Sequence, residues 1–385
     1  MESARYLQIE AGTELGGTPV ARRQNQSLEA IRGIAAVLVV AAHARYFYYL
    51  ESGSPTSGNS QLEQILLFPT SFGREAVAVF FVLSGYFVGG QVVREVFAGR
   101  FTPRVFVAKR LSRFWLVLVP GLLVTALVDG LSRSLFSVDY VVVQGRDSSS
   151  LATALCNVGF LMDGRCETFG SNESLWSLGY EFWFYILFAA FVVGVVSIIR
   201  KAYLPAMVGL GVAVAAVMIF GAHLLLLIPA WVLGVGVAAL RDSGFLSMRL
   251  RKWRFAVAGA SVAVLGLMFA TLVPTGLPVK YAIVGFAVAP LVLVLATLDP
   301  KGPVWLRPIF GFLVWMGSWS FTLYVFHLPF VMLMVAFLTS RSIEASWFMC
   351  YGIVVAALAC AYPMYWVGEA YTNRVRNWAL GSVRQ

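Results

Sequence analysis

Apolar stretches long enough to cross a lipid bilayer recur along nearly the whole chain of 385 residues. A membrane-spanning helix needs about 20 predominantly apolar residues. The sequence predicts such stretches at about 31–50, 76–96, 112–132, 175–199, 203–220, 222–240, 255–273, 280–298, 310–338 and 346–370. The stretch at 310–338 is longer than a bilayer requires, so we expect it to tilt or to begin as an interfacial segment. The pattern predicts an all-α, polytopic transmembrane helix bundle of about ten helices.

Composition excludes a soluble domain. The chain is 59% hydrophobic and 12% charged, whereas soluble domains are about 25% charged. A net charge of +10 would suggest nucleic acid binding in a soluble protein, but in a membrane protein it reports which loops lie in the cytoplasm. We therefore expect a lipid bilayer, and no nucleic acid, as the partner of this surface.

The distribution of basic residues predicts the orientation. If the N-terminus is cytoplasmic, 22 of the 29 Lys and Arg residues fall in cytoplasmic segments and 7 fall outside. Such a bias is typical of the cytoplasmic side of a membrane, and an even number of helices places both termini there. The expected organisation is a cytoplasmic tail at 1–30, one transmembrane domain at 31–370 and a second cytoplasmic tail at 371–385.

Two predicted external segments, 51–75 and 133–174, are rich in Ser, Gly, Asn and Asp. The second contains Cys156 and Cys166, which can pair if the segment is exported to an oxidising compartment. Cys350 and Cys360 fall in an apolar span and are expected to be small core residues. No cluster of residue types with metal-ligand spacing occurs, so we expect no metal.

Arg32 and His43 are the first candidates for chemistry, because ionisable residues within a membrane are costly and commonly functional. Eleven residues of helix turn through about 20° more than a whole number of turns and rise about 16 Å. Arg32 therefore lies at the cytoplasmic end of the first span and His43 lies on the same face, about half-way through the bilayer. A neutral imidazole there can accept a proton or attack an acyl carbon; the alternative is a structural histidine between helices.

The second span begins with Arg74 and Glu75 at its outer end, and its middle contains Ser84 followed by glycines, which allow close helix packing. The cytoplasmic loop that follows is densely basic. The positive-inside rule accounts for much of this charge, but a nucleotide donor also needs such a cluster, since guanidinium groups match phosphate oxygens. Arg110 and Arg113 share one helix face. The loop contains Arg94, Arg100, Arg104, Lys109, Arg110 and Arg113.

Two later spans also carry buried polar groups. Glu181 lies among the aromatic residues Trp176 and Tyr185, and we expect Arg45 or Arg74 to be the partner of its carboxylate. The span at 310–338 contains His327, and Pro329 loosens the helix beside it.

Five motifs together resemble acyltransferase family 3, whose members are integral-membrane O-acyltransferases. The Arg32-to-His43 spacing within SLEAIRGIAAVLVVAAHA is similar to the family's first-helix signature. The others are FFVLSGYFV at 80–88, KRLSRFWLVLVP at 109–120, SLWSLGYEFWFY at 174–185 and SWSFTLYVFHLPF at 318–330. All occur in the family's order. Phe321 stands where the family often has Tyr, and Glu181 is one carboxylate where some members have two. The chain resembles the stand-alone members, which lack a fused extracytoplasmic domain.

The resemblance implies a multi-pass protein of the bacterial inner membrane. It also implies transfer of an acetyl or other short acyl group from acyl-CoA to a hydroxyl of a glycan, glycolipid or other exported acceptor. His43 would then be the general base or a transient acyl carrier, and Glu181 would orient the acceptor hydroxyl or a histidine. Arg32, Arg110 and Arg113 would bind the donor. Substrate-binding residues are expected among Arg74, Glu75, Ser84, Trp176, Tyr185 and His327.

Two other functions are compatible with the composition. A secondary transporter would use buried His, Glu and Arg as a proton relay, but transporters commonly contain repeated halves with matching broken helices, and no such repeat is visible here. A structural or sensory membrane protein would show no dependence on a thioester donor.

Overall fold

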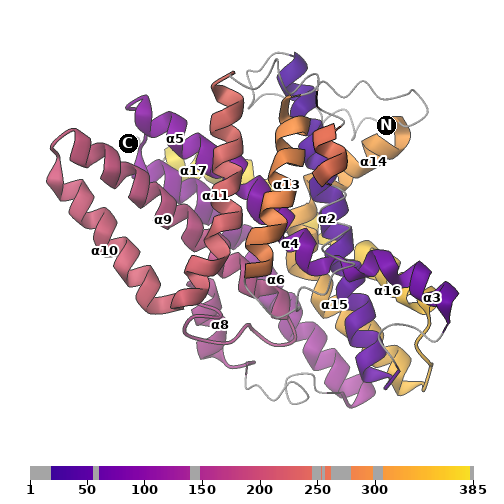
Figure 1. Ribbon diagram of the computed structural model, residues 1–385. Helices are drawn as coiled ribbons and strands as arrows, with labels where there is room; N and C mark the ends of the chain where they lie inside the picture. Colours follow the sequence, from indigo (N-terminus) through magenta and orange to yellow (C-terminus); the bar gives the residue numbers. More distant parts are fainter. Residues whose placement is uncertain are drawn as a thin grey trace.

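The computed structural model describes residues 19–54, 60–138, 148–244, 253, 256–261, 279–297 and 307–381. These residues form helices joined by turns and loops, without a strand (Figure 1). Eight helices of the described part are long and apolar enough to cross a membrane. The predicted all-α, multi-pass bundle is therefore confirmed, while most of the span predicted at 255–273 lies outside the described residues.

The first half of the chain contains the helices that carry most of the predicted motifs. A π-helical turn, η2, joins α4 to α5, and π-helical turns within α-helices are frequent at functional sites. The elements are α2 (Pro19–Glu51), α3 (Gln61–Leu67), η1 (Phe68–Ser71), α4 (Gly73–Ser84), η2 (Gly85–Gly89), α5 (Gly90–Phe97), α6 (Pro103–Phe136), α8 (Leu151–Val158), η3 (Glu173–Leu175) and α9 (Trp176–Ile199).

The second half continues with α10 (Tyr203–Phe220), α11 (Ala222–Asp242), α13 (Val279–Thr297), α14 (Arg307–Ser318), α15 (Ser320–Ser340), α16 (Trp347–Ala361), η5 (Tyr362–Trp366), η6 (Glu369–Tyr371) and α17 (Thr372–Gly381). The stretch predicted as one span at 310–338 is two helices, α14 and α15, which meet at Trp319. The last predicted span loses its α-helical form after Ala361 and passes through the 3-10 turns η5 and η6.

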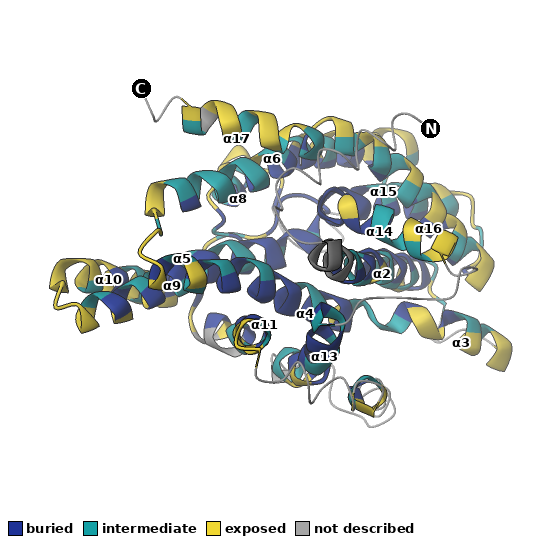
Figure 2. Ribbon diagram, turned by 90° about the horizontal axis from the view of Figure 1, so that it is seen from above, coloured by how far each residue is buried: buried dark blue, intermediate teal, exposed yellow. Residues whose placement is uncertain are grey.

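The core of the bundle is built on α2 and α15. Buried residues concentrate on α2, α4 and α15, and exposed ones on the outer helices such as α10 and α17 (Figure 2). Every residue from Ser320 to Pro329 is buried. Because this run includes hydroxyl and imidazole groups, and buried polar groups are costly without partners, α15 requires hydrogen-bond partners from the helices around it.

Glycines bring α4 and η2 against α11. A Cβ atom at Gly85 would lie 1.8 Å from the carbonyl oxygen of Trp231, and one at Gly234 would lie 1.9 Å from that of Val82. Main-chain atoms thus approach where neither helix has a side chain, which is the packing expected for small residues in membrane helices.

Residues 148–175 fold back into the bundle after α6. The main-chain N–H of Ser171 donates to Oδ2 of Asp129 at 2.9 Å, and its hydroxyl donates to Oδ1 at 2.6 Å. Cys156 and Cys166 form the disulfide expected for an exported segment. The chain therefore enters α9 from inside the bundle rather than from its surface.

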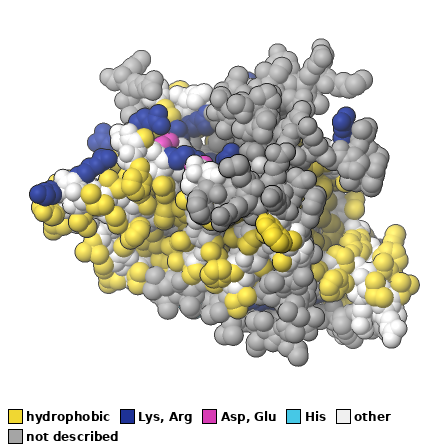
Figure 3. Space-filling view, turned by 45° about the horizontal axis from the view of Figure 1, so that its top comes forward, with side chains coloured by type: hydrophobic (Ala, Val, Ile, Leu, Met, Phe, Trp, Pro, Cys, Tyr) yellow, Lys and Arg dark blue, Asp and Glu magenta, His cyan; other side chains and the backbone are white. Residues whose placement is uncertain are grey.

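Basic side chains line one edge of the molecule, above a broad apolar face (Figure 3). The α5–α6 turn and the α9–α10 turn both contribute to this edge, and α8 lies toward the opposite end of the bundle from α5 (Figure 1). The positive-inside rule predicts that the basic edge is the cytoplasmic one. Its exposed residues include Arg94, Arg100, Arg104, Arg200 and Lys201.

Replacement of Gly234 by Ala should destabilise the bundle by about 1–3 kcal/mol, because the new methyl group meets main-chain atoms that cannot move alone. The measurement is thermal unfolding of the purified protein in detergent. Gly236 on the same helix is the matched control: a Cβ there has no described atom within 4 Å. Gly236→Ala should therefore unfold no earlier than the wild type, and equal loss in both variants would contradict the packing.

Reporter fusions test the orientation. A reporter fused at Ser149, in the segment that contains the disulfide, should behave as exported. The same reporter fused at Gly244, which follows α11, should behave as cytoplasmic, because the basic residues lie on that side. The reverse pattern would overturn the orientation.

Candidate active site

Two histidines from opposite ends of the sequence meet in the core. Nδ1 of His43 on α2 lies 2.9 Å from Nε2 of His327 on α15. The two rings are stacked, with centroids 5.1 Å apart and planes inclined by 25°. His327 is fully buried, whereas His43 is only half-buried.

The surroundings of His327 determine where the hydrogens of the neutral pair lie. Nδ1 of His327 is 2.8 Å from the carbonyl oxygen of Tyr324 and 3.1 Å from that of Leu323. Carbonyl oxygens only accept, so Nδ1 carries the hydrogen and Nε2 is the acceptor. His43 therefore donates from its own Nδ1, and its Nε2 keeps a lone pair. The hydrogen bond from His43 to His327 uses Nδ1. Nε2 of His43 is therefore available to accept a proton.

Pro329 explains why α15 is held so firmly beside this pair. A proline has no N–H, so the carbonyl four residues earlier, that of Val325, loses its partner within the helix. The side-chain amide of Asn172 donates to this carbonyl at 2.9 Å. The hydroxyl of Tyr324 in turn donates to the carbonyl of Ser174 at 3.0 Å. The start of α9 is thereby attached to α15 within one turn of His327.

Three arginines form a charged layer further toward the basic edge. Arg32 donates to both carboxylate oxygens of Glu29, at 2.9 and 3.0 Å. The guanidinium of Arg110 lies between two aromatic rings, 5.3 Å from the centroid of Phe106 and 5.5 Å from that of Tyr185. Arg113 lies 5.6 Å from the ring of Phe321, the position at which the family often has Tyr. We call Arg32, Arg110 and Arg113 the arginine layer.

Glu181 lies beside this layer and ends a chain of hydrogen bonds. Trp231 donates to the hydroxyl of Ser84 at 3.1 Å, Ser84 donates to the hydroxyl of Tyr185 at 2.9 Å, and Tyr185 donates to Glu181 at 2.5 Å. The carboxylate of Glu181 attracts both Arg32 and Arg110. No hydrogen bond joins Glu181 to either histidine in the described part of the chain.

The expectation that Arg45 or Arg74 partners Glu181 is therefore wrong. It assumed that α9 starts at the outer surface, so that Glu181 lies at outer depth. Instead, residues 169–175 run inside the bundle, where Asn172 and Ser174 are buried. The helix α9 consequently starts at the level of the histidine pair. Glu181, which follows about one and a half turns later, therefore lies beside the arginine layer.

Glu369 is a site residue that the sequence analysis missed. Its Oε2 accepts from the main-chain N–H of Thr322 at 3.0 Å and from the hydroxyl of Thr322 at 2.6 Å. Arg113 and Arg32 attract its carboxylate. The signal was present, because Glu369 is a carboxylate inside the stretch 346–370 and such residues are functional candidates by default.

A second proline positions Glu369. Pro120 lies within α6 and leaves the carbonyl of Leu116 without its helical partner. Gly368 packs directly against that carbonyl, where a Cβ atom would lie 2.2 Å from the oxygen. This contact is possible only for glycine, and it places the next residue, Glu369, over the first turn of α15.

The residues predicted to bind substrate lie in three places. Ser84 and Tyr185 lie beside the arginine layer, and His327 belongs to the histidine pair. The rest lie around Tyr281 on α13. Glu75 forms a buried ion pair of 2.6 Å with Lys280, Arg74 acts electrostatically on the hydroxyl of Tyr281, and the ring of Trp176 packs edge-on against that of Tyr281 at 5.9 Å.

Comparison with known proteins supplies the family. A family model described as an acyltransferase domain matches residues 25–366, nearly the whole chain. The chain belongs to acyltransferase family 3. No curated protein and no solved structure matches it.

Membership of acyltransferase family 3 makes this protein a membrane acyltransferase, which requires an acyl donor and a hydroxyl acceptor. The matched region contains the histidine pair and all three members of the arginine layer. Glu369 lies three residues beyond its end. The motifs quoted from the sequence thus contribute both members of the histidine pair and all three arginines of the layer.

Replacement of His327 by Ala should lower the turnover of this acyltransferase about 10- to 100-fold, a part of the roughly 10²–10⁴-fold that a positioned acid–base group supplies. The reason is that His43 loses the acceptor that orients its ring. The measurement is acyl transfer in membranes at matched protein levels, with the donor concentration varied. His223, the third histidine of the chain, is exposed and provides the control. Unchanged turnover in His327→Ala would contradict a positioning role, as would an effect confined to the Michaelis constant for the donor.

Proposed function

We propose that this protein transfers an acetyl or other short acyl group from acyl-CoA to a hydroxyl of a glycan, glycolipid or other exported acceptor, and that it works in the bacterial inner membrane. The observation that carries the proposal is the available Nε2 of His43, whose ring is fixed by His327. Family membership supports acyl transfer in general. The choice of donor rests on the arginine layer, and the choice of acceptor rests on the disulfide-containing segment toward the opposite end of the bundle.

The proposed reaction needs one base and no further protein nucleophile. Nε2 of His43 takes the proton of the acceptor hydroxyl while the hydroxyl oxygen attacks the thioester carbonyl. A carbon–oxygen bond forms, the carbon–sulfur bond breaks, and the thiolate of CoA leaves. His43 then returns the proton to that thiolate, so the products are the acyl ester and free CoA. The hydrogen bond to Nε2 of His327 keeps the reacting nitrogen of His43 in one orientation throughout.

The arginine layer suits the donor. Acyl-CoA is polyanionic and reaches the protein from the cytoplasm, where the basic edge lies. Guanidinium groups bind phosphate oxygens in a planar fork that Lys cannot reproduce. Arg32 and His43 share a face of α2 with a rise of about 16 Å between them, so an extended pantetheine arm can run along this helix from the arginine layer to the histidine pair.

The cluster around Tyr281 suits the acceptor. It combines aromatic rings with a buried ion pair, Glu75 and Lys280. Aromatic faces with a few placed polar groups are typical of sites that bind small polar molecules. The hydroxyl-bearing substrate would then approach His43 from the side of α4 and α13, while the donor approaches along α2.

A His43→Ala variant tests the proposed function. We expect it to lose an acyl group that the wild type adds to cell glycans or glycolipids, because no other described group offers an available base at this position. Mass spectrometry of these fractions from a deletion strain, complemented with wild type or variant, makes the comparison and identifies the acceptor. His223→Ala should restore acylation fully. Persistent acylation by His43→Ala at equal membrane abundance would refute the assignment, and a deletion strain with unchanged glycans and glycolipids would refute the acceptor class.

A further inference from the structure

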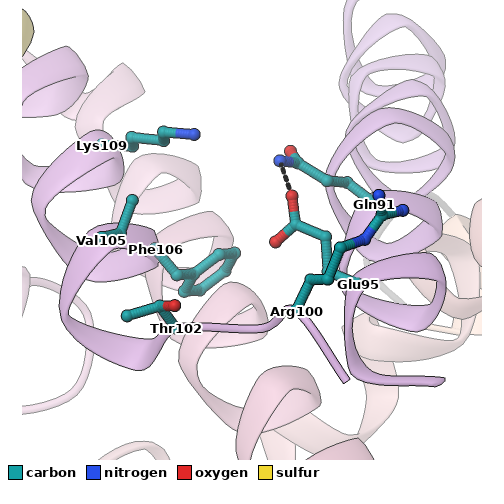
Figure 4. A pocket seen from close by; sticks show the side chains of 7 residues that line it. All are labelled: Gln91, Glu95, Arg100, Thr102, Val105, Phe106 and Lys109. Carbon is teal, nitrogen blue, oxygen red and sulfur yellow. Dashed lines mark hydrogen bonds between the residues drawn. The ribbon is translucent and has the colours of Figure 1, made fainter. Parts of the chain in front are cut away.

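A cavity opens at the basic edge between α5 and α6, outside the arginine layer. Its volume is about 420 Å³, within the range of about 300–1,000 Å³ that is usual for small-molecule sites. Figure 4 shows Lys109 and Phe106 on one wall, from α6, and Gln91, Glu95 and Arg100 on the opposite wall. The remaining lining residues are Thr102 and Val105.

A glycine turn gives the cavity its second cation. The chain leaves α5 through Gly99, whose φ of +68° is in the left-handed region. This turn is closed by the N–H of Arg100, which donates to the carbonyl of Glu95 at 2.9 Å, the arrangement that glycine favours at the end of a helix. Because the chain reverses at this turn, Arg100 lies at the cavity and lines it.

The two walls differ in the chemistry they offer. Arg100 and Lys109 provide positive charge, and Phe106 provides a buried aromatic ring. On the α5 wall the amide of Gln91 donates to Glu95 at 2.6 Å, so the Glu95 carboxylate is oriented and keeps further acceptor capacity. Cations for phosphates, an aromatic surface for a base and an acceptor for an exocyclic amine are together the requirements of a phosphorylated adenine nucleotide.

Arg110 connects this cavity to the arginine layer and has an unused donor. Its Nη2 donates to Oε1 of Gln91 at 2.9 Å, and its guanidinium lies near the ring of Phe106. Its Nε is buried and has no hydrogen-bond partner among the described residues. A buried donor without an acceptor is costly, so this N–H indicates an acceptor that arrives with a ligand.

We propose that the α5–α6 cavity holds the phosphorylated adenosine end of a coenzyme A thioester, and that Arg110 donates hydrogen bonds to its diphosphate where the donor turns into the bundle. This inference rests on the proposed function and adds to it a defined nucleotide site. It requires the donor to be a free nucleotide thioester, because a thioester carried on a protein has no adenosine to fill the cavity. Arg100 and Lys109 contact the nucleotide, and Glu95 accepts from the amino group of its base.

Direct binding to the purified protein in detergent tests the cavity without any acceptor. The probe is adenosine 3′,5′-bisphosphate, which is the nucleotide end of coenzyme A without its pantetheine arm, measured by isothermal titration calorimetry. The double variant Arg100→Gln/Lys109→Gln should weaken its binding at least about tenfold, a difference of about 1.4 kcal/mol. Glu95→Gln should weaken the bisphosphate but not inorganic pyrophosphate.

The matched control removes two charges from the same edge but not from the cavity. Arg104 and Arg200 are both exposed and neither lines the cavity, so Arg104→Gln/Arg200→Gln should bind the bisphosphate like the wild type. Equal weakening in both double variants would show that only the general potential of the edge matters, and would overturn the proposal. So would a wild type that binds pyrophosphate as tightly as the bisphosphate, or that binds neither.

One further variant separates this inference from the proposed function. His43→Ala should bind the bisphosphate with wild-type affinity, because His43 lies far from the cavity. If cells with His43→Ala lose acylation while the wild-type protein binds no nucleotide, the acyltransferase proposal stands and the cavity assignment alone is wrong. If the nucleotide binds as expected but His43→Ala still acylates, the cavity assignment stands and the role of His43 is wrong.

Discussion

The hydrogen bond between the amide of Asn172 and the carbonyl of Val325 is the contact on which the site depends. Pro329 creates the need for it, since a carbonyl without a partner inside an apolar bundle is costly. Because the side-chain amide of Asn172 donates to this carbonyl, the chain before α9 must run inside the bundle and not across its surface. That path fixes the start of α9 beside α15, which in turn places Glu181 beside the arginine layer.

Two helices, α2 and α15, connect the arginine layer to the histidine pair. On α2, Arg32 precedes His43, and on α15, Thr322 with its bound Glu369 precedes His327 by five residues, or about 8 Å of helix rise. Both helices thus run from the charged layer toward the imidazoles. Carboxylates lie near all three arginines: Glu29 pairs with Arg32, Glu369 attracts Arg113, and Glu181 attracts Arg110. A polyanion that binds there exchanges places with carboxylates already held by the protein, which limits the cost of burying its charge.

Sequence reasoning identified the components more reliably than their partners. The spacing of Arg32 and His43 predicts correctly that both lie along one helix, because α2 runs through both residues without a break. The pairing of His43 with His327 joins residues 284 positions apart, and no local pattern encodes such a contact. Glu181 was given the wrong partner because its depth depends on the path of residues 169–175, which hydropathy alone does not predict. Glu369 required only consistent use of the rule for buried carboxylates, whereas its position over α15 depends on Gly368 meeting the carbonyl that Pro120 exposes.

The hydrogen bonds of the histidine pair run in one direction, from His43 to His327 and on to main-chain carbonyls, and this direction limits the chemistry that the pair supports. In the proposed reaction His43 receives a proton at Nε2, while its Nδ1–H donates to Nε2 of His327. Beyond His327 the chain of hydrogen bonds ends at the main-chain carbonyls of Leu323 and Tyr324, which accept a hydrogen bond but do not carry a proton onward. A relay that moves protons across a membrane needs a next acceptor at this point. A group-transfer step needs none, because the proton taken from the hydroxyl leaves with the thiolate from the same side of the imidazole. The pair is therefore suited to hold one proton during one reaction, which agrees with an acyltransferase and not with a proton-coupled transporter.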